Sequence, residues 1–292
     1  MQFDWSTLGA IPPTTLVRAR ILAHHAVQWP SKAARANLEA MPDDSHSSLE
    51  WDDAHAVLFS QPLPANGSDV RIGLRINGFA LTILRGGAVL DTFELAGRRD
   101  SVVAVWLDSA LRALGLKPAS GIKLPYSLPA HAVGRGGAYS SSGEAEAFDE
   151  LARWYAAAAE VLAEVKTGLG GVYPGAGPVR CWPHHFDIAT LVSLEAGCAQ
   201  AARSVGIGLS PGDEYYPQPY VYINPWPHLD PAQFPPLPPP GHWHTQGFVA
   251  AVATGEQILT LADRRSGLLA FINSVYEIGR ARSLSDLGRT NS

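Results

Sequence analysis

The histidines are the residues of this sequence whose type and spacing best suit chemistry. Five of the ten fall between positions 184 and 244. His242 and His244 stand two apart in GHWHT, and alternate side chains of an extended segment point to the same side. Two imidazoles on one side of a strand are a common pair of ligands for one metal ion. The spacing therefore predicts a metal site, with zinc or iron as the expected ion.

Two further segments supply the other expected ligands. If VRCWPHHFDIA is a strand, His185 and Asp187 share one face and His184 lies on the other. We expect His185 to complete three imidazoles, with Glu214, which follows a tight Pro-Gly turn, as an oxygen ligand. Asp187 and His184 are the expected catalytic residues, because a carboxylate or imidazole beside the metal can move protons.

Structural roles compete with each of these assignments. The paired histidines suit a core strand with hydrogen-bonded rings, and Glu214 suits a solvated turn. Cys181, on the His185 face, is either a soft ligand or nucleophile, or a buried and inert thiol. No phosphate-binding glycine loop is present, so no nucleotide cofactor is expected. The sequence also contains no H-E-x-x-H motif and no G-x-S-x-G elbow.

A proline-rich, aromatic stretch offers walls for a substrate. Of the 23 prolines, 11 lie between positions 211 and 240, and no Lys or Arg occurs from 204 to 263. Because disordered proline-rich tails lack aromatic residues, we expect an ordered segment with several of its Tyr and Trp side chains buried. A row on the first expected helix, Arg20, His24 and Gln28, can also reach a ligand. The expected substrate-binding residues are Tyr220, Tyr222, Trp226 and His24.

The order of these motifs resembles an uncharacterised bacterial family, labelled domain of unknown function 5996. The resemblance implies the architecture and no settled activity. Four segments in order carry it: His24 before Gln28, the meander entry SSLEWDDAHAVLF, the strand HHFDIATLVS with Phe186-Asp187, and the run SVGIGLSPGDEYYPQPYVYINPWP with the closing helix LLAFINSVYE.

Hydrophobic periodicity predicts an α+β chain. Apolar residues alternate through SDVRIGLRINGFALTIL, where Asn77-Gly78 is a two-residue hairpin turn. Asp100 suits the cap of a helix. We expect antiparallel sheet over 55–95 and 178–253, and helices near 14–28, 31–41, 100–114, 144–168 and 266–282. These elements predict two sheet-plus-helix halves, 1–120 and 144–292, joined by the Gly/Pro/Ser-rich loop 117–143. The alternative is one fused domain.

Composition excludes several classes of partner. The 292 residues carry a net charge of −5, with 22 basic and 27 acidic residues, so we expect neither nucleic acid nor a membrane as partner. Two cysteines make no disulfide framework, and we expect a cytoplasmic protein of undetermined oligomeric state. The sequence thus predicts a metal-dependent enzyme acting on a small molecule. The alternative is a metal-free protein that binds a small ligand in a Tyr/Trp-lined pocket.

Overall fold

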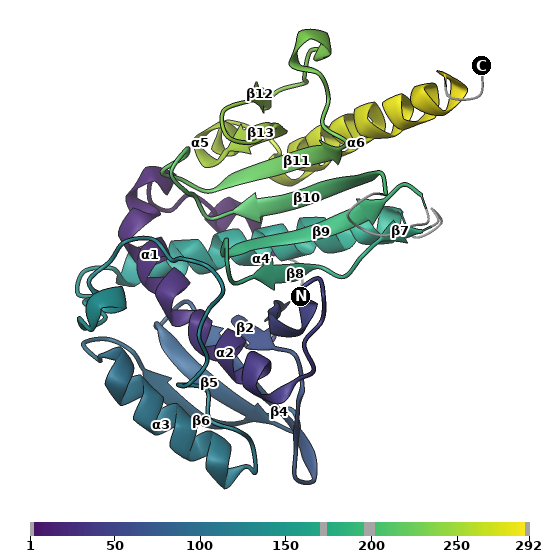
Figure 1. Cartoon of the computed structure of the whole chain (residues 1–292). Helices are drawn as coiled ribbons and strands as arrows, with labels where there is room; N and C mark the ends of the chain where they lie inside the picture. Colours follow the sequence, from purple (N-terminus) through teal and green to yellow (C-terminus); the bar gives the residue numbers. More distant parts are fainter. Residues whose placement is uncertain (1–2, 170–173, 196–201, 290–292) are drawn as a thin grey trace. The chain divides into compact units, whose positions relative to one another are not determined.

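The computed structural model describes the backbone of residues 3–169, 174–195 and 202–289, and the side chains as far as residue 281. Its contacts divide the chain into two units that are not successive halves. The first unit comprises Thr15–Ala156 and Arg180–Asp187, and the second comprises Gln2–Thr14, Ala157–Val179 and Ile188–Ser292. Both units combine helices with antiparallel strands, which confirms the α+β class (Figure 1). Residues 117–143, expected to join two halves, belong to the first unit.

The first unit is built on an antiparallel sheet. Its strand order is β8-β1-β2-β4-β5-β6, with β3 paired to β4. The meander expected over 55–95 is therefore confirmed. The strands are β1 (Leu49–Asp52), β2 (Val57–Ser60), β3 (Leu63–Ala65), β4 (Ser68–Arg75), β5 (Ala80–Arg85), β6 (Ala88–Glu94) and β8 (Arg180–Trp182).

The hairpin between β4 and β5 differs from the expected two-residue turn. Arg75 pairs with Ala80, so four residues form the connection. Gly78 and Phe79 both have positive φ, at 77° and 43°. The ring of Phe79 stacks on that of Phe148, with centroids 4.3 Å apart. This burial offsets the strain of the left-handed backbone and lengthens the turn.

Helices of the first unit begin and end differently from the prediction at two places. The expected helix 14–28 stops at Ala26, and the next helix runs through Pro30, because proline is tolerated in a first helical turn. Asp100 is not a cap: its carboxylate accepts hydrogen bonds from Trp29 (3.2 Å) and Tyr139 (2.8 Å). The helices are α1 (Val17–Ala26), α2 (Gln28–Asn37), α3 (Asp100–Ala113) and the start of α4 (Ala145–Gly168), with short 3₁₀ turns at Pro13–Leu16, Ser45–Ser47 and Val133–Arg135.

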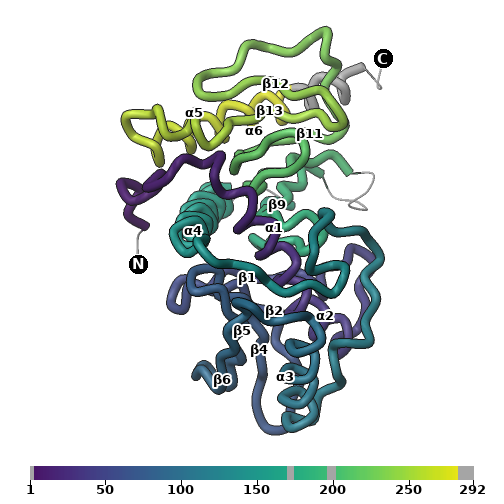
Figure 2. The backbone as a smooth tube through the Cα atoms, turned by 90° about the vertical axis from the view of Figure 1, so that its left-hand side faces the viewer, coloured from purple at the N-terminus to yellow at the C-terminus, as the bar shows by residue number. Residues whose placement is uncertain are grey.

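The second unit has its own antiparallel sheet, in the order β12-β13-β11-β10-β9 with β7 paired to β9. α5 packs on β13, and α6 packs on β10 and β11 (Figure 2). The elements are β7 (Gly175–Ala176), β9 (Asp187–Ser193), β10 (Ser204–Ser210), β11 (Tyr220–Trp226), β12 (His242–His244), β13 (Ala250–Thr254), α5 (Gly255–Leu259) and α6 (Arg264–Arg289), with 3₁₀ turns at Trp5–Thr7 and Pro231–Gln233.

The proline-rich stretch 211–240 is described throughout, and its aromatic residues are only partly buried. Tyr220 is buried on β11 and Tyr222 is half-buried. Tyr215 and Trp226 are 40% and 42% exposed, so the expectation of burial is wrong for these two. Tyr215 lies in the loop before β11, and Trp226 is the last residue of β11, where it pairs with Ser204 of β10 and has no partner on β13.

None of the helices in the described part of the chain is long and apolar enough to span a membrane.

Candidate functional site

The segment 183–186 is a turn, so the strand expected through VRCWPHHFDIA is wrong. β8 ends at Trp182 and β9 begins at Asp187. Proline at 183 has no N–H for a strand ladder, and the N–H of Phe186 donates back to the Trp182 carbonyl at 2.7 Å. Phe186 has φ 57°, in the left-handed region that bulky residues rarely adopt.

The turn also breaks the expected alternation of faces. His185 is exposed, whereas Asp187 is buried, with 7% of its surface exposed. The shared face expected for His185 and Asp187 is therefore wrong. His184, which projects from the same turn, is half-buried.

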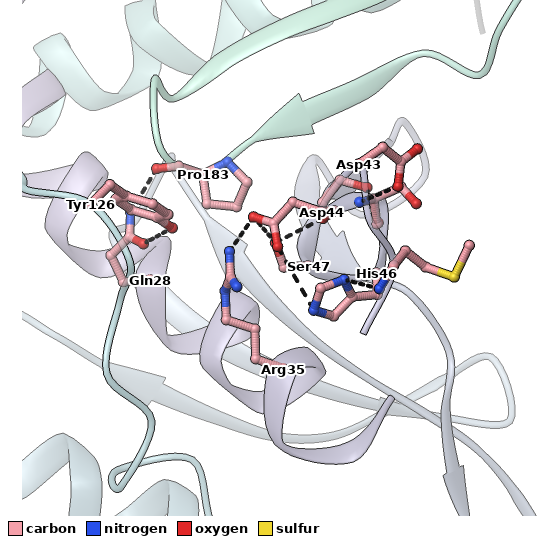
Figure 3. Close-up of polar contacts among 11 residues, drawn as sticks. Gln28, Arg35, Asp43, Asp44, His46, Ser47, Tyr126 and Pro183 are labelled. Atoms are coloured by element: carbon pink, nitrogen blue, oxygen red, sulfur yellow. Dashed lines mark hydrogen bonds and ion pairs between the residues drawn. The ribbon is translucent and has the colours of Figure 1, made fainter. Parts of the chain in front are cut away.

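Two residues of α1 and α2 hold this turn. His24 Nε2 donates to the Pro183 carbonyl at 3.0 Å, and Gln28 Nε2 donates to the same oxygen at 2.8 Å (Figure 3). The His24 ring stacks on Phe186 with centroids 5.4 Å apart. The hydroxyl of Tyr155 donates to the Phe186 carbonyl. The His24–Gln28 segment and the Phe186 segment thus meet, and the turn is fixed at both ends.

A polar row on α2 continues from Gln28. Gln28, Ser31 and Arg35 are spaced i, i+3 and i+7, which places them on one helix face. The Tyr126 hydroxyl donates to Gln28 Oε1 at 2.9 Å, and the Arg35 guanidinium carbon lies 5.8 Å from the centre of the Tyr126 ring. Arg35 forms an ion pair with Asp44 (Figure 3).

Two buried groups of this row, Ser31 Oγ and Arg35 Nε, make no hydrogen bond of normal geometry within the described part of the chain. Both side chains approach Tyr126: burial raises the pKa of Tyr126, and hydrogen bonding to Ser31 and Arg35 opposes that rise. Ser31 is completely buried, and the Arg35 side chain is 12% exposed. Native proteins rarely leave buried donors unpaired, because each costs about 1–3 kcal/mol.

The carboxylate of Asp44 is held opposite α2 by its own loop. Asp44 has φ 62°, which aspartate tolerates better than most residues. The Ser47 hydroxyl donates to it at 3.2 Å, and His46 Nε2 lies 3.8 Å from its other oxygen. His46 Nδ1 accepts the N–H of Met41 at 3.1 Å, which fixes the loop on both sides of Asp44.

His184 faces this group. Its ring centroid lies 5.7 Å from that of Tyr126 and 4.4 Å from that of His185. Burial, and then His185, lower the pKa of His184 from 6.5 to about 4; Arg35 also lowers it and Asp44 opposes them. Within the described structure, the ring nitrogens of His184 make no hydrogen bond to protein. At neutral pH this imidazole is therefore uncharged and able to accept a proton or a hydrogen bond.

Cys181 on β8 and Asp187 at the start of β9 flank the turn. Cys181 is completely buried, and burial, followed by the nearby Asp187 carboxylate, raises the pKa of its thiol well above the usual range. A buried protonated thiol is a poor nucleophile and a poor metal ligand, which agrees with the inert alternative. Burial likewise raises the pKa of the Tyr155 hydroxyl.

The second unit contains the H-x-H pair. His242 and His244 pair with Val252 and Ala250 across β12 and β13. His242 Nε2 lies 3.0 Å, and His244 Nδ1 2.9 Å, from the hydroxyl oxygen of Tyr216. The two imidazoles therefore face the same side, as the spacing predicts.

The other residues expected at this site take different positions. Glu214 is exposed and makes no hydrogen bond or ion pair to either histidine in the described structure. The hydroxyl of Tyr220 donates to Asp213 at 2.5 Å. Trp226 packs edge-on against His228, with centroids 4.9 Å apart.

The four expected metal ligands do not lie within one unit. His185 belongs to the first unit, as does the expected catalytic residue Asp187, and His242, His244 and Glu214 belong to the second. Across the described residues, no three His, Cys, Asp or Glu side chains are grouped so as to hold a metal ion. Metal binding by the predicted ligands, and substrate binding by His24, Tyr220, Tyr222 and Trp226, stay predictions.

Sequence reasoning missed two kinds of residue. The first is the continuation of the α1 row onto α2 at Ser31 and Arg35, which helical spacing reveals only if Pro30 is allowed inside the helix. The second is a pair of tyrosines, Tyr126 and Tyr216, whose neighbours in sequence carry no motif. Comparison of the chain with protein-family models, with curated proteins and with solved structures finds no match. The family resemblance stays a prediction.

Proposed function

We propose that the protein is an enzyme that acts on a small molecule at the α2 site, defined as Ser31, Arg35, Tyr126 and His184. One observation carries the proposal. Two buried groups that lack a hydrogen bond of normal geometry, Ser31 Oγ and Arg35 Nε, lie on the helix face that meets Tyr126, beside the uncharged imidazole of His184. Clusters of perturbed and incompletely bonded polar groups are typical of functional sites.

The charges favour a ligand with a single negative charge at most. Arg35 is already paired with Asp44, so a doubly charged anion gains little from the guanidinium and is repelled by the carboxylate. A carboxylate offers the planar oxygens that suit a guanidinium Nε and a hydroxyl. The rings of Tyr126 and His184 favour a flat organic group attached to it.

His184 supplies the proton acceptor. Its turn is fixed at the Pro183 carbonyl by His24 and Gln28 and at the Phe186 carbonyl by Tyr155, so the imidazole is held in place before a ligand arrives. A bound carboxylate favours the imidazolium form. We therefore expect the pKa of His184 to rise from about 4 when the site is filled, which brings the group nearer the range useful for acid–base catalysis.

Benzoate, a flat carboxylate, tests the site by NMR. We expect a saturable shift of the Arg35 Nε–H signal, and roughly two- to tenfold weaker binding in Ser31→Ala, the cost of one hydrogen bond. Arg35→Lys keeps the positive charge beside Asp44 and removes Nε. The Arg35→Lys protein should bind benzoate more weakly than the control protein Arg85→Lys does. The absence of saturable binding contradicts the proposal.

The same titration separates catalysis from binding alone. If benzoate saturates the site and the pKa of His184 rises, proton transfer at His184 is supported. If benzoate binds and the pKa of His184 is unchanged, the α2 site belongs to a metal-free ligand-binding protein.

A further inference from the structure

Three electron-pair donors converge in the second unit, apart from the residues of the α2 site. They are His242 Nε2, His244 Nδ1 and the hydroxyl oxygen of Tyr216, which lies 3.0 Å from the first and 2.9 Å from the second. All three side chains are half-buried. The group is therefore open enough for a small ion or ligand to reach it.

The hydrogen bonds fix which nitrogen of His244 carries the proton. His244 Nε2 lies 2.6 Å from the Gln246 carbonyl, which only accepts, so this nitrogen is the N–H donor. Nδ1 of the neutral ring then holds a lone pair aimed at Tyr216. Histidines that bind metals usually donate their other N–H to a carbonyl or carboxylate, and His244 has this arrangement.

His242 presents its Nε2 to the same oxygen. Its Nδ1 is buried, and the Gln257 side chain is a hydrogen-bonding neighbour of the ring. The Tyr216 hydroxyl donates its one proton to His244 Nδ1, so its oxygen accepts the N–H of His242 Nε2. Binding of an ion at His242 Nε2 moves this ring proton to Nδ1 and leaves the lone pair of Nε2 for the ion.

The distances from the phenol oxygen to the two imidazole nitrogens suit ligands of one metal ion. Metal–nitrogen bonds of about 2.1 Å in a tetrahedron separate neighbouring ligand atoms by about 3.4 Å. The observed 2.9 and 3.0 Å need to open by only a few tenths of an ångström. No Lys or Arg occurs from 204 to 263, so no cation of this segment competes with an ion.

We propose that His242, His244 and Tyr216 bind one divalent transition-metal ion, such as Zn²⁺, and leave a fourth position open. The phenol oxygen takes the place expected for Glu214, and the nitrogens are those expected from the H-x-H spacing. An ion held by three protein ligands acts as a Lewis acid or activates a water molecule. The phenolic proton passes to solvent when the oxygen binds the ion.

Titration of the purified full-length protein with Co²⁺ tests this site. Four-coordinate Co²⁺ absorbs in the visible range, and Zn²⁺ should displace it. We expect one ion per chain, and affinity lower by on the order of 100-fold in His242→Ala, His244→Ala and Tyr216→Phe, since even outer-shell changes cost 10–100-fold. The matched controls, His228→Ala at an exposed histidine and Tyr222→Phe on β11, should bind as the unmodified protein does.

Tyr216→Phe keeps the ring and its packing, so it decides the question even if a histidine variant fails to fold. Equal affinity in Tyr216→Phe and the unmodified protein overturns the proposal, as does the absence of saturable Co²⁺ binding. Loss of binding only in a His184→Ala, His185→Ala double variant also overturns it, because the ion then belongs to the turn of the first unit.

Discussion

Acid should destabilise the protein through His24, a buried histidine that holds the turn at Pro183. His24 is 8% exposed, and burial, partly offset by its hydrogen bond to the Pro183 carbonyl, lowers its pKa from 6.5 to about 4. The unfolded chain therefore binds a proton at this side chain more readily than the folded chain does. Stability from the neutral ring is present above pH 6.5 and is lost as the pH falls from 6.5 to 4.

The size of the effect follows from the two pKa values. Their difference corresponds to about 3.4 kcal/mol when the loss is complete, at 1.36 kcal/mol per pKa unit. At pH 5 the linkage relation gives a loss of about 2 kcal/mol. Urea unfolding at pH 7 and pH 5 measures this loss as a change in the free energy of unfolding.

His24→Gln is the informative variant, because glutamine retains an N–H donor for the Pro183 carbonyl and does not titrate. We expect the unmodified protein to lose about 2 kcal/mol more than His24→Gln between pH 7 and pH 5. His228→Gln, at an exposed histidine, serves as the control and should behave as the unmodified protein does. Equal losses in His24→Gln and the unmodified protein would refute the reasoning.

Three further substitutions test the hydrogen bonding, packing and backbone of the first unit. Burial raises the pKa of Asp108, but hydrogen bonds from Ser120 and Ala119 outweigh burial and hold this pKa below 3.8. Asp108→Asn should therefore lower the free energy of unfolding by about 1–3 kcal/mol at pH 7, as measured by urea unfolding. The loss should become progressively smaller as the pH falls below 3.8. Gly73→Ala places a Cβ 2.4 Å from Val57 and should lower the free energy of unfolding by about 1–3 kcal/mol, whereas Gly67→Ala meets no atom within 4 Å and tests the cost of positive φ alone.

The sequence predicts what depends on local periodicity. Alternation in the meander gives the strands of the first unit, and the two-residue spacing gives the common side of His242 and His244. Prediction from the sequence fails where tertiary contacts override local preference. Phe186 adopts a left-handed backbone because its ring is completely buried against His24 and its carbonyl accepts from Tyr155, 31 residues away.

The same limit applies to both proposed sites. The polar row of α2 has helical spacing, but its partner Tyr126 lies 98 residues from Gln28, and Pro183 lies 155 residues away. The H-x-H pair is visible in the sequence, but the oxygen between its imidazoles comes from Tyr216, 26 residues before His242. In each case a regular spacing identifies one side of the site, and a single tyrosine hydroxyl supplied by a loop completes it. A tyrosine alone has no spacing that distinguishes it from a packing residue, so only the fold identifies the tyrosine of each site.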